Sequence, residues 1–97
     1  MKRYCKEDIF NTTKNALSKY YILTNKKIDQ SDKSINSIIL IGRNSKFDSL
    51  AFVTFIMILD KELKKLDFKK KLMFEIQKKE FKKLTVKMLI DFIYEVQ

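Results

Sequence analysis

The residues best placed to do chemistry are Asp48 and Ser49, which stand directly before the most apolar segment of the chain, residues 50–59. Only Thr54 is polar within that segment. Aspartate and serine are favoured N-caps, because their side-chain oxygens accept hydrogen bonds from the free N–H groups of a first helical turn. A serine hydroxyl at a loop–helix junction can also be reached by an enzyme that attaches a group to it. Both interpretations are open at this point.

Side chains for catalysis are otherwise scarce. Histidine is absent and Cys5 is the single cysteine, so the chain has no Ser-His or Cys-His pair and no ligand set for a zinc site. The one glycine, Gly42, excludes a glycine-rich phosphate loop. A single cysteine also forms no internal disulfide, so no oxidising compartment is needed. We therefore predict a protein that is not an enzyme and holds no metal.

Length and composition indicate a single domain over residues 1–97. The chain is 45% hydrophobic, which is typical of a globular fold. No long apolar run stands at its N-terminus, and residues 50–59 are too few to cross a bilayer. We expect a cytoplasmic protein without a membrane span.

Lysine dominates the charge. The formal net charge is +9, and residues 61–83 hold ten lysines and four acidic residues. Such a face can attract nucleic acid or an anionic membrane surface. Arginine, whose forked guanidinium reads phosphates and bases, occurs only as Arg3 and Arg43. We interpret the lysines as a solvated face and expect no nucleic-acid partner.

Apolar spacing predicts two long helices in the first two thirds of the chain. The first begins near Asp8 and ends within Tyr21–Thr24, since its apolar residues recur every three or four positions. The second runs over Ser49–Leu66, and its first half is apolar nearly all round, which is typical of a central helix buried on several sides. The polar segment between them, residues 25–47, is expected to be a long loop bent at Gly42 and held to the core by isoleucines, including Ile28 and Ile35.

The last helix has the clearest start. Thr85 is a good N-cap, and Leu84 before it can pack against Leu89 as a hydrophobic staple. One short helix is expected around Gln77–Phe81, where the apolar pattern is weaker. These elements predict an all-α fold, a small three-to-four-helix bundle with a long first loop.

The order of these features resembles the acyl carrier protein family. A helix and a long loop lead to Asp48-Ser49-Leu50 at the start of a hydrophobic helix, and Thr85-Val86 opens the last helix. The segment LIGRNSKFDSLAFVTFI is similar to carrier proteins with Leu-Ile-Gly before the serine motif. The resemblance covers roughly residues 8–96, most closely 47–63 and 84–93, and implies an acyl-carrier-protein-like fold.

The resemblance implies that Ser49 carries 4′-phosphopantetheine, transferred from coenzyme A by a phosphopantetheinyl transferase. Asp48 would be the motif acid that helps this enzyme engage the serine and its metal, and Leu50 the apolar contact that follows. An acyl or aminoacyl group would ride on the thiol of the arm as a thioester. Partner enzymes of a fatty-acid, polyketide-type or specialised pathway would load and transfer it. A monomeric phosphoprotein is expected.

Partner docking is expected along the helix that follows Ser49. The candidate docking residues are Leu50, Val53, Thr54, Met57, Asp60 and Lys61. For Leu50, Val53 and Met57, packing in the core is equally open. Typical members of the family are acidic along this helix, whereas here Asp60 and Glu62 stand among lysines. Charge complementarity then predicts a dedicated partner with a neutral or acidic docking surface.

Two alternatives stay open for the sequence. The chain could be a basic helical module that binds nucleic acid, or a helical protein-interaction module. In both, the pair Asp48-Ser49 is only a helix cap.

Overall fold

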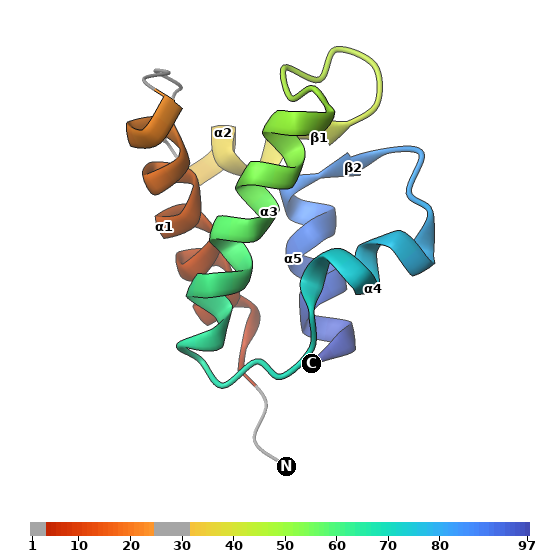
Figure 1. The fold of residues 1–97 in the computed structure, drawn as a ribbon. Coiled ribbons are helices and arrows are strands. Elements are labelled where there is room, and N and C mark those ends of the chain that lie inside the picture. Colours follow the sequence, from red (N-terminus) through yellow and green to blue (C-terminus); the bar gives the residue numbers. More distant parts are fainter. Residues whose placement is uncertain (1–3, 25–31) are drawn as a thin grey trace.

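A computed structural model describes residues 4–24 and 32–97 (Figure 1). The elements are α1 (Lys6–Thr24), α2 (Asp32–Ser37), β1 (Ile39–Ile41), α3 (Ser49–Lys64), α4 (Leu72–Lys79), β2 (Leu84–Thr85) and α5 (Val86–Val96). Most described residues are helical, which confirms the helical class. The described residues form five helices and a two-stranded sheet, whereas three to four helices and no sheet were expected.

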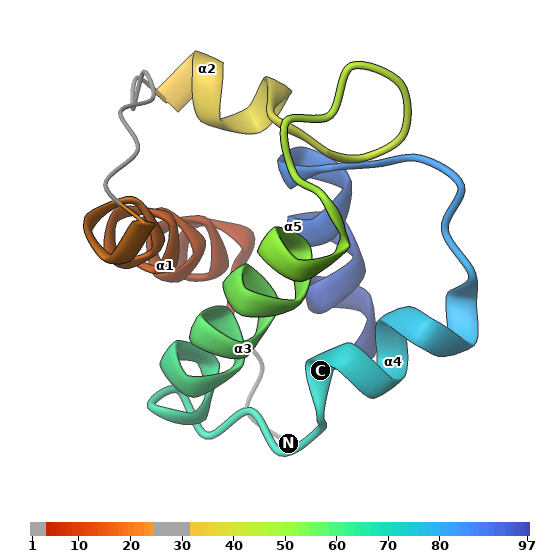
Figure 2. The ribbon, with the colours of Figure 1, turned by 45° about the horizontal axis from the view of Figure 1, so that its top comes forward.

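The core lies between amphipathic helices. α1 packs along α3 and also contacts α5, while α3 contacts α4 and α2 contacts α5. Figures 1 and 2 both show α3 next to α1, with α2 across the end at which α3 begins. The predicted α1 stripe is confirmed, because Ile9, Thr13, Ala16, Leu17, Tyr20 and Tyr21 are all buried.

α3 is less enclosed than its sequence suggests. Its buried residues are Phe55, Ile56, Leu59 and Leu63. Leu50, Val53 and Met57 are exposed, so the first half of α3 is buried on part of its circumference but not nearly all round, as its apolar sequence suggested. The reason is the layout of the fold: α1 and α4 cover parts of α3, and a third side faces solvent.

The segment expected to be one long loop contains a helix and a strand. Within its described part, α2 is anchored by buried Ile35 and β1 by buried Leu40, so these residues are held to the core as expected. Ile28 lies outside the described residues. β1 pairs antiparallel with β2, with Ile39 opposite Thr85. This pairing joins segments that are far apart in the sequence, and local sequence patterns cannot predict it.

The short helix also differs from its prediction. α4 begins at Leu72 and ends at Lys79, ahead of the expected Gln77–Phe81. Leu72 and Ile76 lie one turn apart and are both buried, so they define the inner side of α4. Glu80 then takes a left-handed conformation with φ of 51°, which ends the helix. The many lysines around Leu72 and Ile76 make the helical spacing of the apolar residues hard to recognise in the sequence.

A buried tyrosine leads to the first prediction. Tyr21 is buried, and its hydroxyl has no hydrogen-bond partner among the described residues. An unpaired buried polar group costs about 1–3 kcal/mol, so Tyr21→Phe is expected to raise the free energy of unfolding by about 1 kcal/mol at neutral pH. Urea unfolding of parent and variant measures this difference.

The same substitution predicts a change at high pH. Burial raises the pKa of Tyr21 from 10.0 to about 12. The unfolded chain therefore releases this proton at lower pH than the folded chain. Stability from the neutral phenol is present below pH 10 and is lost as the pH rises toward about 12. The gap between variant and parent should widen over that window, and a variant less stable than the parent would contradict the assignment.

Candidate functional site

Asp48 caps α3. Its backbone is extended, and its Oδ1 atom accepts a hydrogen bond of 2.7 Å from the N–H of Ala51. Its carbonyl accepts the first intrahelical bond, from the N–H of Phe52 at 2.9 Å. This geometry confirms a capping role for Asp48.

Ser49 has a different position. It is the first residue of α3 and is exposed, and its hydroxyl forms no hydrogen bond with any described residue. Capping therefore accounts for Asp48 but not for Ser49. The result is an accessible primary hydroxyl at the positive end of the α3 dipole.

The loop before Ser49 is firmly held. Gly42 follows β1 with φ of 123°, a conformation that L side chains rarely adopt. The Ser45 hydroxyl lies 2.9 Å from the carbonyl oxygen of Ile39 and accepts a hydrogen bond of 3.1 Å from the N–H of Phe47. Phe47 is buried and stacks on Tyr20 with ring centroids 5.3 Å apart. Ser49 thus follows an anchored residue by two positions.

A cavity of about 510 Å³ lies beside Ser49. Asp48, Ser49 and Phe52 border it on the α3 side, and Met73 and Ile76 border it from α4. Its volume falls within the range of small-molecule sites in proteins, roughly 300–1,000 Å³. A group attached to Ser49 would have this space next to it.

Three of the predicted docking residues form an exposed row on α3. Leu50 is 76% exposed, Val53 39% and Met57 57%. Their spacing of three and four places them on one side of the helix. The sequence left docking and core packing open for these residues, and their exposure excludes the core. We call Leu50, Val53 and Met57 the apolar row.

The polar docking candidates are less uniform. The Thr54 hydroxyl donates to the carbonyl of Leu50 at 2.9 Å, and Lys61 is exposed. The Asp60 carboxylate accepts from the N–H of Leu72 at 3.2 Å and pairs with Lys64 at 3.4 Å. Lys71 provides no side-chain cap for α4, so Asp60 supplies that bond from α3. This carboxylate is therefore engaged within the molecule.

Glu62 is engaged as well. Its Oε2 atom lies 2.8 Å from Nζ of Lys19 and 3.1 Å from Nζ of Lys65. The hydrogen bond from Lys19 lowers the pKa of Glu62, and the same bond raises the pKa of Lys19. Acids near the C-terminal end of α3 are thus paired with lysines, which leaves little free negative charge along this helix.

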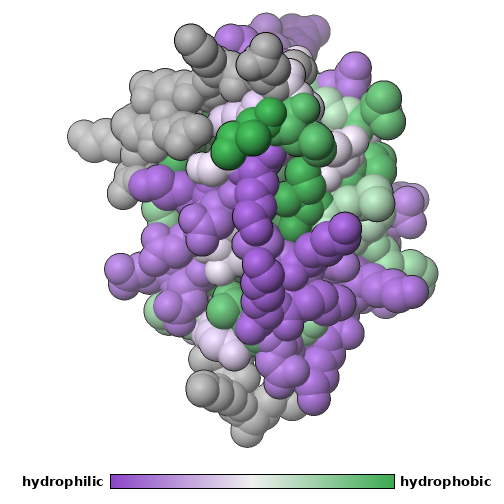
Figure 3. Space-filling model, turned by 60° about the vertical axis from the view of Figure 1, so that its left-hand side comes forward, coloured by the Kyte–Doolittle hydropathy of each residue, from purple (hydrophilic) through white to green (hydrophobic). Residues whose placement is uncertain are grey.

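Ile22 and Leu23 are exposed apolar residues that the prediction of functional residues missed. They lie in the last turn of α1 and are 82% and 68% exposed, outside the buried stripe of that helix. This turn lies at the end of the molecule where α3 begins (Figure 1). Figure 3 shows hydrophobic surface gathered in the upper half of the face that it presents, with hydrophilic side chains dominant in the lower half. The available signal was two large apolar residues adjacent to the α1 stripe.

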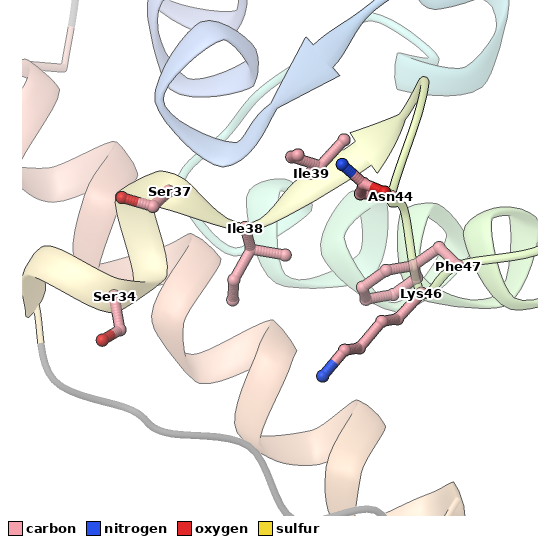
Figure 4. A pocket seen from close by; sticks show the side chains of 7 residues that line it. All are labelled: Ser34, Ser37, Ile38, Ile39, Asn44, Lys46 and Phe47. Atoms are coloured by element: carbon pink, nitrogen blue, oxygen red, sulfur yellow. The ribbon is translucent and has the colours of Figure 1, made fainter.

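A second cavity, of about 470 Å³, lies between α2, β1 and the loop that follows (Figure 4). Its lining residues are Ser34, Ser37, Ile38, Ile39, Asn44, Lys46 and Phe47. Phe47 borders both cavities, while Ser49 borders only the first. Over residues 4–24 and 32–97 no group of three or more Cys, Asp or Glu side chains could hold a metal ion.

Comparison with protein-family models, curated proteins and solved structures finds no match to this chain. Its function must therefore be inferred from the residues themselves.

Proposed function

We propose that the chain is a carrier protein of the acyl carrier type. Ser49 receives 4′-phosphopantetheine from coenzyme A, and the arm carries an acyl or aminoacyl group as a thioester. The observation that carries this proposal is the exposed Ser49 hydroxyl, free of hydrogen bonds to described residues while Asp48 does the capping.

The attachment chemistry suits this position. The Ser49 oxygen would form a new phosphate ester with the pantetheine phosphate of coenzyme A, the bond to the nucleotide part would break, and the hydroxyl proton would pass to the transferase or to water. The product is an anionic phosphodiester at a helix N-terminus. Free N–H groups and the helix dipole stabilise negative charge there. Asp48 already accepts from one of these groups and keeps the turn in place.

The surroundings of Ser49 suit a carrier that supplies no catalytic groups of its own. The apolar row begins one residue after Ser49 and offers exposed hydrophobic contacts to enzymes that load or unload the arm. The open pocket between α3 and α4 offers an attached apolar group side chains such as Phe52, Met73 and Ile76 to lie against. Partner enzymes would provide the chemistry, and the thiol of the arm would provide the reactive atom.

The charges predict the kind of partner. Asp60 and Glu62 are held by lysines, so a basic enzyme surface would find little negative charge along α3. A fatty-acid synthase system that docks on acidic carriers is expected to elongate chains on this protein poorly at physiological salt. Lys61→Glu should raise the elongation rate, and Lys87→Glu, at an exposed position on α5, is the matched control. Efficient elongation on the parent would contradict this partner assignment.

The direct test is the intact mass of the protein after incubation with coenzyme A and a broad-specificity phosphopantetheinyl transferase. Addition of one phosphopantetheine group is the expected result. No addition with several transferases would reject the carrier proposal, and the chain would then be a helical interaction module.

A further inference from the structure

The outer side of α4 is basic and carries one exposed aromatic ring. Phe74 is 55% exposed, although Leu72 and Ile76 of the same helix are buried. Lys71 lies one turn before Phe74 and Lys78 one turn after it. The Nζ atom of Lys78 is 4.6 Å from the centroid of the Phe74 ring. We call Lys70, Lys71, Phe74 and Lys78 the α4 face.

Most of the positive charge near this face is uncompensated. Between residues 61 and 83, acidic partners are found for Lys64, Lys65 and Lys78. The lysines of this segment without an ion pair to any described residue are Lys61, Lys69, Lys70, Lys71, Lys79, Lys82 and Lys83, all of them exposed. A partner that covers this region must therefore bring negative charge.

We propose that the α4 face binds the surface of an anionic lipid bilayer. The Phe74 ring enters the boundary between headgroups and acyl chains, and the surrounding lysines lie against the lipid phosphates. No helix over residues 4–24 and 32–97 is long and apolar enough to cross a membrane, so the association is peripheral. This inference does not depend on the carrier function.

The composition of the face favours a bilayer over nucleic acid. Its cations are all lysines, which act as hydrated point charges and lack the fork with which arginine grips a phosphate. It presents one aromatic ring, whereas single-stranded nucleic acid is bound by rows of rings on which successive bases stack. A lone ring among lysines matches a surface with diffuse negative charge and an apolar interior.

Binding through this face leaves the carrier site open. Met73 and Ile76, which border the cavity beside Ser49, lie on another side of α4. Ser49 itself is at the N-terminal end of α3, whereas Lys64, whose Nζ donates to the carbonyl of Lys70 at 2.7 Å, is at the other end. A membrane-bound molecule could therefore still present Ser49 to an enzyme.

The test is co-sedimentation of the full chain with vesicles of phosphatidylcholine and phosphatidylserine in equal parts, beside vesicles of phosphatidylcholine alone. Binding is expected only to the anionic vesicles and should weaken as salt screens the lysines. Phe74→Ser is expected to lower partitioning about tenfold, the factor that corresponds to partial burial of a phenyl ring. Leu23→Ser, at an apolar position on α1 that is 68% exposed against 55% for Phe74, should leave partitioning unchanged.

A second measurement uses fluorescence, because the chain has no tryptophan. Phe74→Trp should show a blue-shifted emission when anionic vesicles are added, and Leu23→Trp should not. Lack of binding, equal losses for Phe74→Ser and Leu23→Ser, or an unshifted Phe74→Trp spectrum would overturn the proposal. Tighter binding to a single-stranded RNA oligonucleotide that Phe74→Ser does not weaken would also overturn it, and would assign the lysines to nucleic acid.

Discussion

Ser49→Ala is expected to abolish phosphopantetheine attachment and to leave the fold intact. The substitution removes the nucleophilic oxygen, and no other residue of the motif can replace it. The lost hydroxyl forms no hydrogen bond with any described residue, and Asp48 retains the cap. The free energy of unfolding should therefore change by no more than about 0.5 kcal/mol. Intact mass and urea unfolding measure the two effects on the same sample.

Two neighbouring residues serve as matched controls. Ser45→Ala keeps the motif but removes hydroxyl bonds that hold the loop, so it should lose about 1–2 kcal/mol and still accept the group. Asp48→Ala should lose about 1 kcal/mol through the missing cap and react more slowly. A mass increase in Ser49→Ala, or a loss of stability as large as that of Asp48→Ala, would contradict the assignment of Ser49.

Phe55→Ala is expected to be the most destabilising single change on α3. Phe55 is completely buried, and its ring centroid lies 6.2 Å from that of Tyr20 and 5.9 Å from that of Phe47. Removing the ring leaves a cavity beside the two remaining rings, those of Tyr20 and Phe47, at a cost of about 3–5 kcal/mol. Small domains are stable by roughly 5–15 kcal/mol, so much of the stability would be lost.

Urea unfolding measures this loss, and Met57→Ala is the control because Met57 lies on the same helix and is largely exposed. Equal stabilities of the two variants would show that the contacts among Tyr20, Phe47 and Phe55 do not hold α3 in the core. Since Phe47 immediately precedes Asp48, we also expect slower modification of Ser49 in Phe55→Ala at temperatures where the variant remains folded.

The long helices were predictable because their signals are local. The α1 stripe and the start of α3 follow from residues within a few positions of one another. The cap of α5 follows likewise, since Oγ1 of Thr85 accepts a hydrogen bond of 3.2 Å from the N–H of Met88. Such patterns can therefore be recognised from neighbouring residues alone, although packing supplies most of the stability of each helix.

The remaining features depend on contacts between distant residues. Ile39 gains its strand partner from Thr85, and the N–H of Val86 donates to the carbonyl of Ile38 at 3.0 Å. The sequence places Asp48 and Ser49 side by side, but it does not tell which of them caps α3 and which keeps an exposed hydroxyl. The sequence also does not show that the apolar row lies outside the core, because its exposure depends on which sides of α3 are packed against α1 and α4. The candidate attachment residue was thus predictable, and its free hydroxyl was not.

The pairing of β1 with β2 has a consequence for protein synthesis. The loop that leads to Ser49 starts at β1, and the partner strand β2 is synthesised only after α3 and α4. While the ribosome is still producing α4, β1 has no partner strand, and the β1 carbonyls that the Ser45 hydroxyl contacts lack the support of β2. Ser49 should therefore adopt its presented position only after Leu84 and Thr85 have left the exit tunnel. Incomplete chains would then be poor acceptors for any enzyme that recognises the finished junction.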